Sequence, residues 1–219
     1  SISSGTKSFS FAYIEKKNYR SMDFSSMMGY ITTREFATLV FSRFYPKKNE
    51  NVSVISHEEK SEVLEKLNEK YFDYTTFYTD NIFYKDQYFV HKENGEIVAG
   101  VQANRVEWEI LEFPGRNGAL LMKMVPKLPL MSKLFQPGGF KFAAFEGIYY
   151  KPGHEKKLPG LFESACTMLG VNVGLSWMDT ESSLYKDVIE AGNLGFLCKV
   201  MKSQPANVRV KFLDVPENE

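Results

Sequence analysis

Two stretches of the sequence decide its division into domains: FSFAYIEKKNYRSMDFSSMMGYITTREFATLVFSRFY (residues 9–45) and VNVGLSWMDTESSLYKDVIEAGNLGFLCKVMKSQPANVRVKFL (residues 171–213). Each contains a strand pattern, a short helix, a glycine followed by an aromatic residue, and a second strand. The glycines, Gly29 and Gly195, are 195 − 29 = 166 residues apart, which is one domain length. We therefore expect one complete domain over residues 50–219 and the trailing part of an earlier copy over residues 1–49.

The first stretch has clear local signals. Ser8–Ile14 alternates as a strand with one aromatic face would. A short helix is expected from Asn18, which can cap the first turn, to Gly29, which can adopt the left-handed conformation that ends a helix. Phe36–Tyr45 is typical of a long strand, and the polar segment 46–51 is expected to be a linker.

The segment after the linker mixes strands and helices. A strand at 52–55 precedes a helix whose capping box is Ser56 and Glu59, and Asn94-Gly95 is a strong hairpin signal. The later patterns predict, in order, strand 140–150, helix 158–169, strand 171–177, a helix carrying Leu184 and Val188, and strands 196–202 and 208–213. This order indicates an α/β fold that begins with antiparallel strands.

The composition excludes several classes of protein. Lys and Arg total 27, as do Asp and Glu, so no net charge attracts nucleic acid. Two cysteines, Cys166 and Cys198, cannot build a disulfide framework or a four-ligand zinc site, and the three histidines lack metal-ligand spacing. We therefore expect no metal and a reducing, cytoplasmic location.

Two further segments bear on whether the chain contacts a membrane and whether it is a fragment. No stretch reaches the roughly 18 to 20 uninterrupted apolar residues of a membrane span. The apolar segment Leu120–Phe135 contains lysines and prolines, so it is either a long loop over the sheet or a cover for an acyl chain, a partner or a lipid surface. The start at Ser1 lacks signal-peptide features and suggests a fragment or a processed form.

The repeated layout resembles the GCN5-related N-acetyltransferase (GNAT) superfamily. The family's late motif, an Asn, a small residue, a short helix, a glycine and an aromatic, is matched in the first copy by Asn18, Ser21 and Gly29-Tyr30. In the second copy Leu184-Tyr185 and Gly195-Phe196 match, whereas the Asn is absent and extra residues precede the glycine. The resemblance implies a mixed, mostly antiparallel central sheet flanked by helices.

The resemblance also implies a site for the pyrophosphate of coenzyme A. Family members hold it on backbone N–H groups at a helix N-terminus, after the fourth strand, because these groups and the helix dipole favour anions. Here that place holds KPGHEKKLPGLF, residues 151–162. The residues expected to bind the cofactor are Lys156, Lys157, Leu158, Gly160 and Leu161. Pro159, which has no N–H, and the bulky Phe162 depart from the family pattern.

Two residues are candidates for catalysis. Tyr185 stands where many family members carry the Tyr that protonates the departing thiolate; alternatively, it packs beside Leu184. Glu146 lies in an apolar strand, where a carboxylate either faces a cleft and serves as a base or lies on an exposed face.

The resemblance therefore implies acyl transfer from acetyl-CoA, or another acyl-CoA, to an amine acceptor. The alternative is a GNAT-like domain that has lost catalysis and serves as an interaction or ligand-binding module. In that case it could pair with an upstream GNAT-like copy or form a homodimer.

Overall fold

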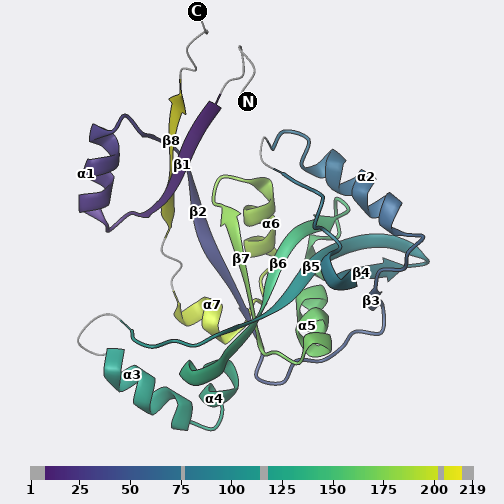
Figure 1. Ribbon diagram of the computed structural model, residues 1–219. Helices are drawn as coiled ribbons and strands as arrows, with labels where there is room; N and C mark the ends of the chain where they lie inside the picture. The colour runs from purple at the N-terminus through teal and green to yellow at the C-terminus, as the bar shows by residue number, and fades with distance from the viewer. Residues whose placement is uncertain (1–7, 75–76, 114–117, 202–204, 214–219) are drawn as a thin grey trace, which may run out of the picture. The chain divides into compact units, whose positions relative to one another are not determined.

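The computed structural model describes residues 8–74, 77–113, 118–201 and 205–213. Figure 1 shows strands and helices that alternate along the chain, and the described pairings are mostly antiparallel. The α/β class with a mixed, mostly antiparallel sheet flanked by helices is thus confirmed. Within the described residues, no helix combines the length and the apolar character that crossing a membrane requires.

The described residues divide into two compact units. The smaller unit contains the residues up to Leu39, Trp177–Lys186 and the residues from 205 onward, and the larger unit contains Val40–Ser176 and Asp187–Met201. Both units combine segments from distant parts of the chain. The expected division into residues 1–49 and 50–219 concerns repeated copies and stays a prediction.

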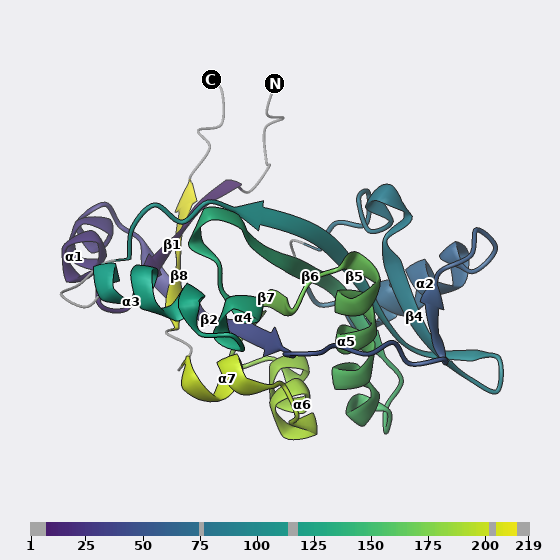
Figure 2. The ribbon, with the colours of Figure 1, turned by 90° about the horizontal axis from the view of Figure 1, so that it is seen from below.

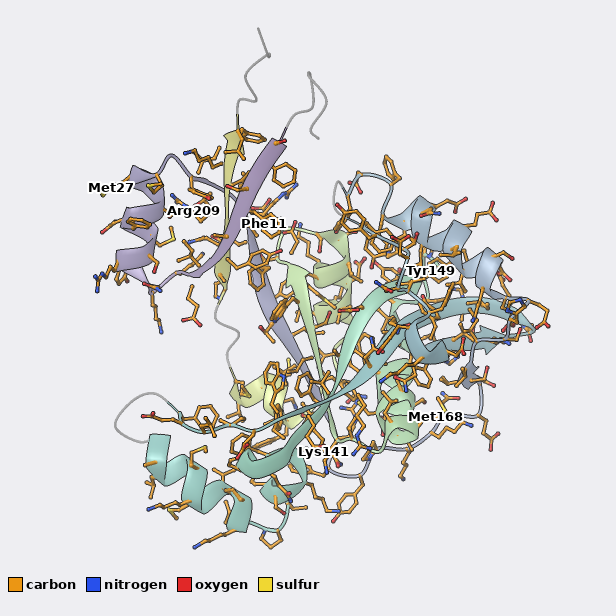
Figure 3. The ribbon with its side chains drawn as sticks, in the orientation of Figure 1. Phe11, Met27, Lys141, Tyr149, Met168 and Arg209 are labelled. Atoms are coloured by element: carbon orange, nitrogen blue, oxygen red, sulfur yellow. The ribbon has the colours of Figure 1, made fainter. Side chains whose placement is uncertain are left out.

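The smaller unit is built around strand β8 (Ala206–Leu213), which pairs antiparallel with β1 (Ser8–Glu15) and with β2 (Ile31–Ser42). Helix α1 (Tyr19–Met27) begins after Asn18, whose Oδ1 accepts the Ser21 N–H at 3.1 Å, as expected. In Figure 3, Arg209 of β8 lies toward α1, whereas Phe11 of β1 points away from the helix. One face of this small sheet is therefore covered by α1 and the other carries aromatic side chains.

The larger unit contains an antiparallel series of strands followed by one parallel pairing. Strand β4 (Tyr88–Glu93) pairs with β3 (Val52–Val54) and with β5 (Glu96–Trp108), and β6 (Phe140–Tyr150) pairs with β5 and runs parallel to β7 (Val173–Asp179). The β4–β5 hairpin turns at Asn94 and Gly95, which have φ of 51° and 83°, as the Asn-Gly signal predicts.

Helices cover both sides of these strands. Helix α2 (Lys60–Lys70) and helix α5 (Leu158–Leu169) lie on opposite sides in Figure 1, and Figure 2 shows α5 running along the strands from below. The apolar side chains of α5 from Leu158 to Cys166 are buried and Leu169 is half-buried, and the helix ends at Gly170, which is left-handed with φ of 66°. Helix α2 buries Val63 and Leu67, and the Ser56 N–H bonds the Glu59 carboxylate at 2.9 Å, as in a capping box.

Two segments differ from expectation. The segment Leu120–Phe135 is not the plain long loop that was one of its two predictions, because it contains the short helices α3 (Gly118–Met124) and α4 (Met131–Leu134), while its role as a cover stays a prediction. The predicted strand at 196–202 is wrong, because Phe196–Val200 forms helix α7 after α6 (Ser183–Ala191). Residue 202 lies outside the described part of the chain.

Helix α7 forms because a distant side chain caps it. Its own N-cap, Gly195, has no side chain, and the Ser42 Oγ of β2 accepts the Leu197 N–H at 2.9 Å in its place. Gly195 lies so close to Ser42 that an added Cβ would be 1.9 Å from the Ser42 carbonyl oxygen. This packing favours a helix over the strand that the local sequence indicates.

Candidate functional site

Strands β6 and β7 pair over only a short distance. Their register joins Ala143 to Gly174 and Ala144 to Leu175, whereas β6 continues to Tyr150. Beyond Ala144, therefore, the β6 backbone has no recorded pairing with β7. Peptide groups in that part of the strand can bond a ligand that lies along it.

The part of β6 that follows Ala144, which pairs with β5 but has no recorded pairing with β7, contains a bulge. The register with β5 shifts between Gly100 and Gln102, opposite the segment of β6 in which Gly147 has φ of 51°. Two buried hydroxyl groups hold this segment, because Tyr88 donates to the Gly147 carbonyl at 2.9 Å and Tyr71 donates to the Ile148 carbonyl at 2.8 Å. The bulge is thus fixed by the surrounding core.

The lysine-rich turn comes directly after β6, and its cations have acidic partners. Lys157 and His154 pair with Glu93, at 3.4 Å for His154, and Lys151 contacts Glu96 at 2.6 Å. The hydrogen bond from Lys157 is the main reason that the pKa of Glu93 is lowered. Lys156 is exposed. The β4–β5 hairpin therefore balances much of the positive charge that the sequence places in this turn.

The same turn holds an anion of its own. Glu155 accepts the Gly153 N–H at 2.8 Å, and its carboxylate also receives its own backbone N–H. These two bonds, the second being the larger effect, lower the pKa of Glu155. The backbone N–H groups of Gly153 and Glu155 therefore converge on one carboxylate.

The remaining predicted cofactor residues lie at the start of α5. Leu158 and Leu161 have buried side chains, so only their backbone can serve a ligand. Gly160 has room for a Cβ, which would make an ordinary contact with its nearest neighbour, Asn49 Nδ2, at 3.9 Å. Phe162 is buried against Phe145, with ring centroids 4.6 Å apart.

The two predicted catalytic residues lie in different units. Tyr185 is half-buried on α6 in the smaller unit, and its backbone N–H bonds Ser182 Oγ at 3.1 Å. Glu146 is an exposed residue of β6 in the larger unit, just before the bulge. Of the two environments that the sequence left open for Glu146, the structure shows the exposed one.

A group of residues whose mutual contacts the sequence does not predict lies at the end of β6. The Tyr150 hydroxyl donates a hydrogen bond to Asp187 of α6, and the Lys70 ammonium group lies 3.5 Å from the centroid of the Tyr150 ring. Burial lowers the pKa of Lys70, while Asp187 and Glu155 act in the opposite direction. No spacing in the sequence connects these residues, because the contacts join positions far apart in the chain.

The described part of the chain offers no metal centre: no group of three or more His, Cys, Asp or Glu side chains there could hold an ion. A cavity of about 190 Å³ lies between α4, the start of β6 and the connection from α5 to β7. None of the predicted site residues lines it.

Comparisons with known proteins agree with this architecture. No family model matches the sequence, and no curated protein matches it. A GCN5-related N-acetyltransferase from Sphaerobacter thermophilus is similar in structure, with a TM-score of 0.53 and 11% identity, over 96% of this chain and 61% of that one. A GNAT-family acetyltransferase from Colwellia psychrerythraea matches with a TM-score of 0.48 and 12% identity, over 95% of this chain and 66% of that one.

The chain therefore spans less than two thirds of the length of these structures. At such low identity the similarity concerns the fold. The order of β6, the lysine-rich turn, α5 and β7 matches the element order that the resemblance in sequence implied. The chain has the fold of the GCN5-related N-acetyltransferases.

Proposed function

We propose that this protein is an N-acyltransferase that moves an acetyl or longer acyl group from acyl-CoA to an amine. The observation that carries the proposal is that the recorded β6–β7 pairing ends at Ala144, whereas β6 continues to Tyr150 and is followed by the lysine-rich turn and the start of α5. An extended ligand with an anionic end can lie with its anion at the turn and its other end along the unpaired part of β6.

The residues of the turn fit the pyrophosphate of coenzyme A. The Glu155 carboxylate accepts the N–H groups of Gly153 and of Glu155 itself, which supports the idea that backbone N–H groups of this turn can bind an anion. Lys156 is exposed and adds positive charge, and the open space at Gly160 permits close approach to the backbone. The backbone of Lys156, Lys157, Leu158, Gly160 and Leu161 would hold the pyrophosphate, and the bound cofactor would supply the activated thioester.

The protein's own groups would then handle protons. Tyr185 is the candidate acid for the departing thiolate, since a phenol hydroxyl can donate a proton there. Glu146 stays the predicted base for the acceptor amine, although its exposed side chain corresponds to the alternative in which it has no catalytic role.

Thermal unfolding with and without acetyl-CoA tests the proposal. Acetyl-CoA at about 100 times its dissociation constant should stabilise the protein by roughly 2.7 kcal/mol. Lys156→Glu should remove most of this gain, whereas Lys141→Glu, in an exposed residue outside the turn, should leave it intact. If neither acetyl-CoA nor longer acyl-CoAs raise the melting temperature, the proposal is wrong.

A second function, an interaction module without catalysis, is favoured by the aromatic face of the smaller unit. Phe9, Phe11 and Tyr13 of β1 are 41%, 53% and 55% exposed. The line of rings continues through Phe36 to Trp177, which is 68% exposed. The neighbouring strand β1 is an end strand of the sheet, and it has no charged residue from Ser8 to Ile14. An exposed aromatic face beside such a strand favours pairing with an upstream copy or with a second chain. Sedimentation of wild type and Phe11→Ser would show a concentration-dependent dimer that the variant loses.

A further inference from the structure

The segment between β5 and β6 has an exposed face of unusual composition. Helix α3 continues directly into the 3₁₀ turn at 125–127. Exposed residues follow one another here at spacings of three, one, three and one, and they are Leu120, Lys123, Met124, Lys127 and Leu128. This spacing places them on one side of the helical stretch, which we call the α3 face. The solvent side of a helix normally carries polar residues, whereas the α3 face combines lysine with large apolar side chains.

The apolar side chains of the α3 face are open to solvent. Leu120, Met124 and Leu128 are 56%, 55% and 51% exposed, and Leu130, two residues further on, is 48% exposed. In Figures 1 and 2, α3 lies at the end of the larger unit that is far from α2. A contiguous group of exposed apolar side chains of this kind marks a surface that binds something.

The rest of the segment is fixed to the core, so the α3 face is presented on a firm base. Leu134 of α4 is 1% exposed and packs with Phe142 of β6. The Phe135 ring lies 5.8 Å from the Phe140 ring, measured between centroids. Pro126 and Pro129 restrict the backbone beside the exposed side chains, which lowers the cost of ordering them on binding.

The charge of the segment has one sign. No Asp or Glu occurs between Glu112 and Glu146, whereas lysines recur through that stretch. Lys123 and Lys127 are both exposed, and among the described residues no carboxylate forms an ion pair with either of them. The α3 face therefore carries positive charge that is available to a negatively charged partner.

This combination of side chains fits the surface of an anionic bilayer. Centres of protein interfaces are depleted of lysine and enriched in aromatic residues, and nucleic acid is bound through its phosphates without a need for exposed leucine. At a bilayer, leucine and methionine side chains enter the boundary between headgroups and acyl chains, while lysine side chains extend to the anionic headgroups.

We infer that the α3 face, together with Leu130, is a docking surface for a bilayer that contains anionic lipids. The contact is peripheral: apolar side chains enter the interface and lysines bind headgroups. The inference goes beyond the proposed function and does not depend on it, because no residue of the α3 face belongs to the candidate acyl-CoA site.

Sedimentation of the whole chain with lipid vesicles tests the inference. Each lysine near an anionic surface strengthens binding about fivefold, so vesicles of phosphatidylcholine and phosphatidylserine should bind at least about tenfold more tightly than vesicles of phosphatidylcholine alone. Raising the salt from about 0.1 M to about 1 M should remove this preference, because the Debye length falls from about 10 Å to about 3 Å.

Two double variants separate the charged and the apolar parts of the surface. Lys123→Glu/Lys127→Glu should weaken binding to the anionic vesicles at least about tenfold. The control, Lys17→Glu/Lys85→Glu, makes the same change in net charge at exposed lysines outside the segment and should alter binding by less than about twofold. Leu120→Ser/Leu128→Ser should also weaken binding at least about tenfold, because less apolar surface enters the bilayer.

Three outcomes would overturn the inference. The first is no binding to anionic vesicles, and the second is binding that is equally tight to phosphatidylcholine alone or that neither double variant weakens. The third is a concentration-dependent dimer, without vesicle binding, that the leucine variant loses; the partner would then be a second chain. Melting temperatures verify that the variants fold, and the comparison of the two vesicle types on the wild type needs no variant.

Discussion

The connection after α1 and the connection after α6 look alike in sequence but differ in structure. Both have a glycine before an aromatic residue, and both glycines have positive φ, 83° at Gly29 and 99° at Gly195. After Gly29 the chain enters strand β2, whereas after Gly195 it forms helix α7. The two glycines have different neighbours. A Cβ added at Gly29 would have Lys211 Cε at 3.8 Å, whereas one added at Gly195 would lie 1.9 Å from the Ser42 carbonyl oxygen. A shared motif fixes the local backbone turn, while tertiary contacts decide which element follows it.

The largest effect is expected from an added methyl group at Gly195. Gly195→Ala places a Cβ 1.9 Å from the Ser42 carbonyl oxygen at a φ that alanine rarely adopts, so backbone must move. We expect a loss of more than about 3 kcal/mol in the free energy of unfolding, measured by urea titration. Gly29 also has positive φ, but an added Cβ would make only an ordinary contact with Lys211 Cε. The matched Gly29→Ala should therefore cost only about 1 to 2 kcal/mol. Equal losses would show that the strained φ accounts for both effects and that the contact with Ser42 adds nothing.

The next effect concerns the cap that α7 takes from β2. Ser42→Ala removes the acceptor of the buried Leu197 N–H, and such an unpaired group costs about 1 to 3 kcal/mol. Unfolding should be followed by the fluorescence of Trp108, which lies in the larger unit, in a Trp177→Phe background. Thr33→Ala, on the exposed part of the same strand, should change stability by less than about 0.5 kcal/mol. A neutral Ser42→Ala would contradict this account of α7.

The smallest effect is expected at the cap of α1. Asn18→Ala removes the acceptor of the Ser21 N–H and should cost about 1 kcal/mol. Trp177 of the smaller unit, observed in a Trp108→Phe background, reports this change. Asn18→Asp replaces the amide oxygen with a carboxylate oxygen that can still accept the Ser21 N–H, and it should keep the wild-type midpoint. If Asn18→Ala loses as much free energy of unfolding as Ser42→Ala, the expected difference between the two caps is absent.

The sequence predicted those parts of the fold that depend on neighbours along the chain. The alternation of Ser8–Ile14, the apolar face of α5 and the turn at Asn94-Gly95 are local patterns, and the structure confirms them. The segment Phe196–Val200 could not be assigned correctly, because its capping group is 155 residues away at Ser42.

In the candidate site, too, only the features that depend on neighbours along the chain could be predicted from the sequence. The position of the lysine-rich turn between β6 and α5 followed from local patterns. The pairing of Lys157 with Glu93, and the burial of Lys70 against Tyr150, depend on contacts between segments that the sequence does not place together. The roles of Tyr185, Glu146 and the residues from Lys156 to Leu161 stay predictions.

The phenols that hold the β6 bulge also provide an optical signal. Burial raises the pKa of both Tyr71 and Tyr88 above the usual value near 10. Their contribution to stability is complete below pH 10 and is lost as the pH rises toward their folded-state values. In an alkaline absorbance titration, exposed tyrosines will ionise first and reversibly. The ionisation of these two will coincide with unfolding, so the bulge can be monitored without any added label.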